Sequence, residues 1–425
     1  MTTAVDRATH APTIPAWTGH AAGAPAYRRL VVALMAGGLA NFSLMYFVQP
    51  LLPMLASHYG VTAAESAHAL SITTLTIILG LAATGPLADR VGRVAVMRWS
   101  LLASGVLGLL CALAPTWSIL LLLRGLLGLT LAGLPGAALA YLREEVDGTS
   151  HPRANAAYIA GTAVGGAAGR LLPGPLAAIG GWPLAAGTVS VVTLAAGVLL
   201  VVLLPPSRGF RAHPVALRET LAGTLRAPAD RVVGLLCVVG FAAMGAFVGS
   251  YNAVAFRLQA APFLLGAAAS LVYLAYPVGI AAPTVARALA ARIGRGRAAT
   301  AGVALLAVSV VLLSFPVLPA VVAGLGLITF AFLGTHSLLS GWVVDRAQRT
   351  GRGTAQASSA YLGTYYLGST LAGALATWLW QTGGWTGVAV LGLALCAVAF
   401  SAGVAATRRD TDPREIGEGD AIALA

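Results

Sequence analysis

The feature that most constrains this chain is a series of apolar segments, each about 20 residues long, that recurs along most of its length. A helix of about that length is needed to cross a hydrocarbon core roughly 30 Å thick. Hydrophobic types make up 58% of the 425 residues and charged types only 9%, whereas soluble chains carry roughly a quarter charged residues. The chain is therefore predicted to be an integral membrane protein, and its apolar content excludes a disordered or collagen-like chain.

Twelve such segments are found, and each is predicted to be a helix because backbone groups in lipid must bond within their own segment. The alternation of side chains expected of barrel strands is absent. The predicted fold class is an all-α membrane protein with twelve transmembrane helices in two pseudo-symmetric six-helix bundles. The expected spans are residues 29–56, 66–86, 94–114, 117–143, 154–179, 183–204, 231–256, 263–287, 298–315, 318–343, 355–380 and 385–406.

A long polar stretch near the middle of the chain divides the spans into two sets of six. The expected units are a disordered cytoplasmic tail (1–27), an N-terminal bundle (28–204), a cytoplasmic linker (205–230), a C-terminal bundle (231–406) and a cytoplasmic tail (407–425). No apolar stretch of signal-peptide length is found in residues 1–27.

The two sets of spans repeat the same residues at a spacing of 202 or 203 positions. The matching pairs are Tyr158 and Tyr361, Gly165 and Gly368, Gly180-Gly181-Trp182 and Gly383-Gly384-Trp385, and residues 89–93 and 291–295. Repeats of this length indicate duplicated halves, which are typical of transporters that expose a shared site to each side in turn.

The positive charges predict the orientation. Placing both termini in the cytoplasm puts all of the 26 arginines on that side except Arg124, Arg170, Arg257 and Arg287, as the positive-inside rule requires. The net charge of +12 is therefore interpreted as a topology signal and not as a nucleic-acid-binding surface. Because the chain contains no lysine, it cannot carry a P-loop or a lysine Schiff base.

The loop between the second and third spans reads GPLADRVGR, residues 85–93. We expect Gly85 to allow close approach of a neighbouring helix and Gly92 to allow a tight turn. With Asp89, Arg90 and Arg93, these residues resemble the G-x-x-x-D-R-x-G-R loop of the major facilitator superfamily, although Val94 stands at its last basic position. The resemblance implies that this loop latches one half against the other in the outward-facing state.

Two arginines inside spans extend the resemblance toward bacterial inner-membrane efflux permeases of the drug/proton antiporter type. Arg124 matches the arginine motif of span four, which that branch links to proton transfer. Residues 161–170 resemble the span-five signature G-x-x-x-G-P-x-x-G-G, but Gly166 replaces its proline and Arg170 its last glycine. The resemblance covers residues 29–406 and implies a multi-pass protein of the bacterial cytoplasmic (inner) membrane.

No acidic residue lies near the middle of any span, so the two intramembrane arginines predict a positively charged cavity. One hypothesis is that the substrate carries a carboxylate or phosphate that pairs with Arg124, Arg170 or both. The alternatives are that Arg124 snorkels to the surface and that Arg170 is a structural residue bonded to backbone carbonyls.

Other polar side chains in the spans are candidates for the substrate or proton pathway, although each alone could be a satisfied packing residue. They are Tyr46, Gln49, Asn252, Tyr273, His336, Tyr361 and Tyr365. His336 is a candidate proton carrier because it alone among span-centre groups titrates near neutral pH. Glu144 and Glu145, at the inner end of span four, are the rival candidates.

The predicted function is secondary active transport, with proton-coupled export of a small organic drug or metabolite by alternating access. The expected partners are this solute, protons and the lipid bilayer, and the protein is expected to be a monomer. A uniporter or importer of a sugar or organic anion is the closest alternative, and a passive channel is less favoured. No G-x-S-x-G or H-E-x-x-H string is present, so no enzyme, catalytic residue, cofactor or metal site is expected.

Overall fold

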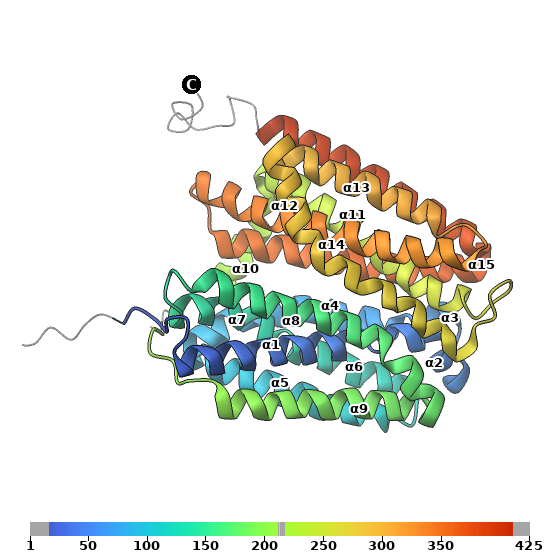
Figure 1. Ribbon diagram of the computed structural model, residues 1–425, viewed down its shortest axis with the longest axis horizontal. Helices are drawn as coiled ribbons and strands as arrows, with labels where there is room; N and C mark the ends of the chain where they lie inside the picture. The colour runs from blue at the N-terminus through green and yellow to red at the C-terminus, as the bar shows by residue number, and fades with distance from the viewer. Residues whose placement is uncertain (1–16, 211, 213–216, 411–425) are drawn as a thin grey trace, which may run out of the picture.

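The structure is built almost entirely of helices. The computed structural model describes residues 17–210, 212 and 217–410. Among these residues, the only β-type pairing is an isolated bridge between His20 and Val146. Two helical bundles lie one beside the other, with their helix axes roughly along the long dimension of the molecule (Figure 1).

The N-terminal bundle contains the helices that precede the linker. These are α1 (Pro25–Tyr46), η1 (Gln49–Leu51), α2 (Leu52–Tyr59), α3 (Ala63–Ser66), α4 (His68–Val91), α5 (Arg93–Ala112), α6 (Trp117–Leu131), α7 (Gly133–Glu145), α8 (His151–Leu171) and α9 (Pro173–Leu203).

The linker and the C-terminal bundle follow. They contain α10 (Leu217–Arg226), η2 (Ala227–Ala229), α11 (Arg231–Arg257), η3 (Gly266–Ala281), α12 (Ala282–Ile293), α13 (Arg295–Leu312), α14 (Leu318–Arg349) and α15 (Thr354–Asp410).

Within the described residues, ten helical stretches are long and apolar enough to cross a membrane. Two breaks at glycine residues divide these stretches further, so that the chain crosses the predicted membrane twelve times. Gly384 has a φ of 59° and divides α15 into two passes. Gly180 and Gly181 break α9, so that α8 and the first turns of α9 make one pass and the rest of α9 makes the next. The repeated Gly-Gly-Trp strings therefore mark equivalent turns in the two bundles.

Prolines explain why two predicted spans are not continuous α-helices. The first span changes to a 3₁₀ turn at Gln49–Leu51, where Pro50 is followed by Pro53. A proline lacks the backbone N–H that an α-helix needs and clashes with the preceding turn. The segment predicted as an ordinary helix over 263–287 is instead a 3₁₀ helix, η3, with Pro277 inside it, and continues as α12.

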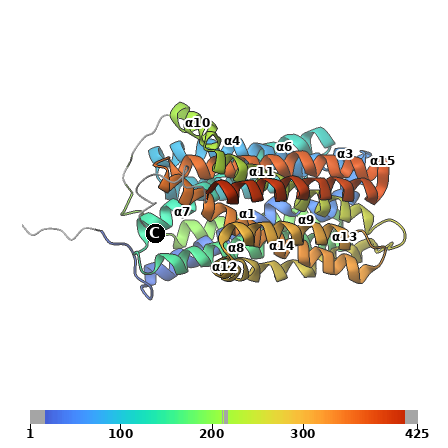
Figure 2. The same ribbon diagram turned by 90° about the horizontal axis from the view of Figure 1, so that it is seen from above.

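Part of the linker is helical, and the described end of the predicted N-terminal tail is bonded to the bundle. The linker contains the amphipathic helix α10, which packs against α4 and α15 at the edge of the bundle (Figure 2). Trp17 donates its indole N–H to the carbonyl oxygen of Glu144, 3.2 Å away, which anchors residues expected to be disordered. The predicted tails are partly helical, since α1 begins at Pro25 and α15 continues to Asp410, whereas residues 1–16 and 411–425 lie outside the described residues.

The two bundles contact each other away from the end where the chain starts and finishes. We call the end where α1 begins and α15 ends the terminal end, and the opposite end the distal end (Figure 1). Ser71 and Thr74, near the distal start of α4, bond to Thr370 of α15. The backbone N–H of Ala64 donates to Gln381 at 3.4 Å. These contacts join the bundles toward the distal end.

Candidate functional site

The break after α1 turns Gln49 toward the C-terminal bundle. Gln49 is fully buried, and its side-chain N–H donates to Oδ1 of Asn252 on α11 over 2.7 Å. The two residues are 203 positions apart, the spacing of the sequence repeat. This hydrogen bond therefore joins the two bundles through residues that the repeat makes equivalent.

Arg170 bonds to Gln49 from the N-terminal bundle. Its Nε donates to Oε1 of Gln49 at 2.6 Å, and one Nη donates to the carbonyl oxygen of Gly166 at 2.8 Å. The other Nη, NH2, is buried and has no hydrogen-bond partner among the described residues. Arg170 is therefore only partly satisfied by the protein, unlike a purely structural arginine.

In the C-terminal bundle, the contact equivalent to that between Gln49 and Arg170 is made by Asn252 and an uncharged residue. Nδ2 of Asn252 donates to the carbonyl oxygen of Gly373 at 3.3 Å. Asn252 and Gly373 are 121 positions apart, as are Gln49 and Arg170. Because Gly373 occupies the position equivalent to Arg170, the duplicated geometry contains a cation on one side only.

Aromatic rings enclose the Arg170 guanidinium. Its central carbon lies 3.9 Å from the ring centre of Tyr46, 4.9 Å from Tyr276, 5.1 Å from Tyr251 and 5.7 Å from Phe247. These distances are within the range of cation–π attraction. Sequence reasoning finds Tyr46 but misses the three rings from the C-terminal bundle, because aromatic residues in an apolar span usually indicate packing only.

The hydrogen bonds of the Arg124 guanidinium all go to backbone carbonyls. It is fully buried, so it does not snorkel, and it donates to the carbonyl oxygens of Ala69, Leu44 and Met45 at 2.9–3.3 Å. The last two carbonyls lie where α1 ends and lose their helical partners. Arg124 thus joins α6 to α1 and α4.

Three of the remaining candidates in the C-terminal bundle, His336, Tyr361 and Tyr365, form a second aromatic group. Nδ1 of His336 lies 2.9 Å from the hydroxyl of Tyr361. The His336 ring also packs on Phe332 and Tyr365, with centroids 6.0 and 4.8 Å apart. Tyr273 stacks on Tyr251 and has a buried hydroxyl without a partner among the described residues.

The loop residues lie at the terminal end, far from this aromatic region along α4 and α5. Arg93 pairs with Asp89 at 2.6 Å and with Glu144 at 3.2 Å, so these contacts stay within the N-terminal bundle. Gly92 has a φ of 93°, which confirms the predicted tight turn. The predicted close helix approach at Gly85 is wrong, since a Cβ there would meet nothing within 4 Å. Arg90 is exposed.

Glu145 binds the linker. One of its carboxylate oxygens accepts hydrogen bonds from the Ser207 hydroxyl and from the backbone N–H groups of Arg208 and Gly209, at 2.5–2.8 Å. Glu144 is bonded to Arg93. Both rival proton carriers therefore have partners that hold the terminal end together.

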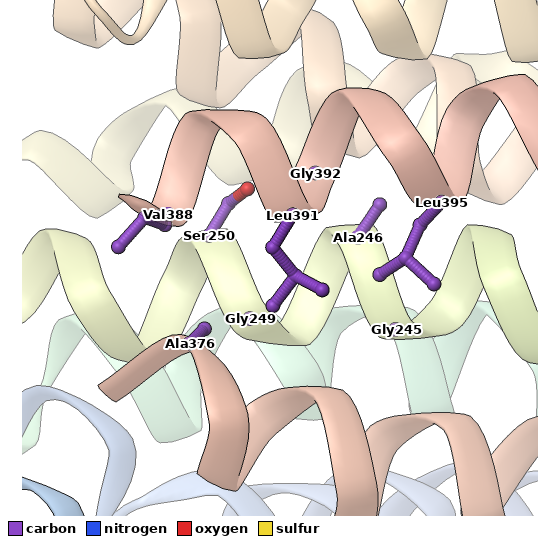
Figure 3. A pocket seen from close by; sticks show the side chains of 9 residues that line it. All are labelled: Gly245, Ala246, Gly249, Ser250, Ala376, Val388, Leu391, Gly392 and Leu395. Atoms are coloured by element: carbon purple, nitrogen blue, oxygen red, sulfur yellow. The ribbon is translucent and has the colours of Figure 1, made fainter. Parts of the chain in front are cut away.

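Two pockets differ in the size of molecule that they can hold. The one in Figure 3 lies between α11 and both parts of α15, is lined by small and aliphatic residues such as Gly249 and Leu391, and has no room for a water molecule. A larger pocket of about 570 Å³ lies between the bundles at the distal end, with Pro50, Gly174 and Ser270 in its lining. Only this second pocket has the volume of a small-molecule site.

The described part of the chain shows no cluster of three or more His, Cys, Asp or Glu residues that could hold a metal ion. Cys111, Cys237 and Cys396 are buried and form no disulfide bond among the described residues.

Comparison with known proteins places these features in a family. Residues 34–256 match the family model described as Major Facilitator Superfamily. The chain is 35% identical over 390 residues to the inner membrane transport protein YnfM of Escherichia coli (strain K12), covering 91% of this chain and 92% of that protein. It is 34% identical to the uncharacterized MFS-type transporter YybF of Bacillus subtilis (strain 168), covering 86% and 90%.

Among solved structures, the chain resembles a bacterial homologue of the human lysosomal transporter Spinster, solved in an inward-facing and unoccupied conformation. The TM-score is 0.67, with 15% sequence identity, and the match covers 90% of this chain and 94% of that one. That likeness supports the fold, and the sequence relatives establish the membership. The chain belongs to the major facilitator superfamily and is a secondary transporter.

Proposed function

We propose that this transporter exports a small organic molecule, a drug or metabolite, in exchange for protons by alternating access. The observation that carries the proposal is the Gln49–Asn252 hydrogen bond between equivalent positions of the two bundles. A contact between equivalent residues lies near the pseudo-symmetry axis, where inverted or parallel repeats place the transport site. We infer that residues 28–204 rock against residues 231–406 about this point, while the linker 205–230 connects them.

The orientation rests on the distribution of arginine. With the terminal end in the cytoplasm, the arginine-rich loops face inward, as the positive-inside rule requires. The distal contacts then close the outer side. We infer that the protein lies in the bacterial inner membrane with both termini cytoplasmic, works as a monomer, and uses Gly85, Asp89, Arg90, Gly92 and Arg93 as a latch in the opposite state.

His336 is the proposed proton carrier. It lies beside Tyr361 and Tyr365 in the described structure, whereas Glu144 and Glu145 are bonded at the terminal end. A histidine ring can gain and lose a proton, and the neighbouring hydroxyl provides a hydrogen-bond partner for the neutral ring.

The test uses purified protein in proteoliposomes that contain a pH-sensitive dye, with organic anions, cations and neutral drugs added in turn. Proton-coupled export predicts that an outward solute gradient drives protons inward, and that His336→Gln abolishes this proton movement. Solute flux without proton movement would identify a uniporter. Proton coupling that survives in His336→Gln but is lost in Glu144→Gln or Glu145→Gln would assign the coupling to the glutamates.

A further inference from the structure

We propose that Arg170 and Tyr273 form an anion-binding point between the two bundles, and that the solute is an organic monocarboxylate. The proposal rests on the proposed function for the movement of the solute, but its binding can be measured independently.

The charge of Arg170 lacks a counterion. Its side chain is fully buried, it donates hydrogen bonds to an amide oxygen and a backbone carbonyl, and no carboxylate of the described residues pairs with it. A buried charge without an ionic partner is unfavourable unless a ligand supplies one. The unused Nη can donate to a carboxylate oxygen, which a guanidinium binds with short, charge-assisted hydrogen bonds.

Tyr273 supplies a second donor in the same region. Its hydroxyl is buried without a partner among the described residues. Its ring stacks on Tyr251 with centroids 5.7 Å apart, and Tyr251 in turn covers the Arg170 guanidinium. Two unpaired donors, one of them charged, favour a ligand whose polar group only accepts hydrogen bonds, as an ionised carboxylate does.

The surroundings favour a single negative charge attached to an apolar body. The rings of Tyr46, Phe247 and Tyr276 face the guanidinium and provide apolar walls. A monocarboxylate would balance the one unpaired cation, whereas a doubly charged phosphate would leave a buried negative charge.

The distal pocket is lined by residues close in sequence to this point. Its lining includes Pro50, adjacent to Gln49, Gly174, one helical turn beyond Arg170, and Ser270, three residues before Tyr273. The volume of about 570 Å³ is sufficient for a small organic acid. The pocket lining thus comes within four residues of Arg170 and three of Tyr273 along the chain, although neither of these side chains lines it.

Arg124 does not serve as a second anion point. Its Nε and both Nη atoms already donate to backbone carbonyls, two of them at the end of α1. The structure thus separates two arginines that the sequence leaves as equal candidates.

The test measures the thermal unfolding of the purified full-length protein with benzoate, butyrate or 2-naphthoate, each compared with its own amide. Binding to the native state raises the unfolding temperature. We expect at least one carboxylate to raise it in a saturable way while the isosteric amide does not. If no carboxylate binds more tightly than its amide, the proposal is wrong.

Variants locate the binding point. Arg170→Gln should abolish the preference for the carboxylate, Arg170→Lys should retain a weakened preference, and Tyr273→Phe should weaken affinity about tenfold. Tyr141→Phe is the matched control, because the Tyr141 hydroxyl bonds to Pro205 at the terminal end. A carboxylate preference that persists in Arg170→Gln would overturn the assignment.

The binding and transport results are separable. A protein that binds the carboxylate through Arg170 but moves no protons in proteoliposomes supports this site and contradicts the proposed proton coupling.

Discussion

The two bundles share a backbone plan but differ in the chemistry that they place at its centre. The N-terminal bundle contains two fully buried arginines, Arg124 and Arg170, whereas the buried arginines of the C-terminal bundle, Arg257 and Arg346, lie near the ends of α11 and α14. The equivalent of Arg170 in the C-terminal bundle is Gly373, and that bundle instead contributes aromatic rings and His336. The duplicated helices keep their turns, the amide pair Gln49 and Asn252, and close contacts, while the charge of Arg170 is present in one bundle only.

The close crossing of two helices at a glycine is retained in both bundles. A Cβ at Gly165 would overlap the carbonyl oxygen of Leu39 in α1, and a Cβ at the equivalent Gly368 would overlap that of Phe241 in α11. Small residues at such crossings let helix backbones approach closely in a membrane. This packing position is therefore shared by the two bundles, whereas the buried charge of Arg170 is not.

The largest expected effect is that of Arg124→Gln. The substitution leaves the carbonyl oxygens of Leu44, Met45 and Ala69 without their arginine donors in a buried region. Ala69 keeps the Thr73 hydroxyl as a donor, so two carbonyls are left unsatisfied; at about 1–3 kcal/mol each, we expect a loss of roughly 2–6 kcal/mol in the free energy of unfolding. Thermal unfolding in detergent measures it.

Arg170→Gln is the matched comparison, and it should destabilise the protein less because Arg170 has one unused Nη. An Arg124→Gln protein as stable as the wild type would contradict the structural role of Arg124.

Glycine substitutions test the symmetric part of the comparison. Gly165→Ala and Gly368→Ala should each lower the free energy of unfolding by about 2 kcal/mol, because the helices must separate to admit the methyl group. Gly383→Ala is the control, since a Cβ there meets nothing within 4 Å. Clearly unequal losses at Gly165 and Gly368 would show that the two crossings are not equivalent.

The bond between the bundles should show a measurable coupling. A double-mutant cycle of Gln49→Ala and Asn252→Ala is expected to give an interaction of about 1 kcal/mol, typical of a buried hydrogen bond. Thermal or denaturant unfolding of the four proteins measures it. Strictly additive effects would mean that the bond contributes nothing to the closed distal end.

The smallest expected effect lies outside the membrane, in the turn between α7 and α8. Hydrogen bonds from the side chains of Ser150 and Thr149, together with the backbone N–H groups of the same two residues, lower the pKa of the Asp147 carboxyl to about 2. A lowered pKa gives stability that is present above the unfolded-state value of about 4 and is lost as the pH falls toward 2.

Asp147→Asn should therefore be slightly less stable than the wild type at pH 7, and the difference should shrink as the pH falls below about 4. Unfolding temperatures at a series of pH values measure this. A difference that is independent of pH would show that the ionised carboxylate is not what stabilises the turn.

Much of the fold could be predicted from the sequence because the membrane restricts the choices so strongly. Apolar length gives the spans, and the Gly180-Gly181-Trp182 repeat marks equivalent turns. The breaks are harder to predict: Pro50 and Pro53 are visible, but whether a proline bends a helix or ends it depends on what packs around it.

The candidate site is less predictable. Arg170, Gln49 and Asn252 could each be selected as polar residues in apolar spans, but their mutual bonds depend on which faces of distant helices meet. Phe247, Tyr251 and Tyr276 have no sequence signal that separates them from core aromatics. The distinction between Arg124 and Arg170 likewise depends on which donors the folded backbone uses.

The most direct test of the central claim follows the distance between spin labels at both ends of the bundles. One pair, Met54→Cys and Leu264→Cys, reports on the distal end, and another, Val91→Cys and Ile293→Cys, reports on the terminal end; all four side chains are exposed. Both pairs are placed in a background without Cys111, Cys237 and Cys396. Alternating access predicts that a change of pH or added solute widens the distal distance while the terminal distance narrows. Two distances that stay fixed, or that widen together as in a channel, would contradict the account.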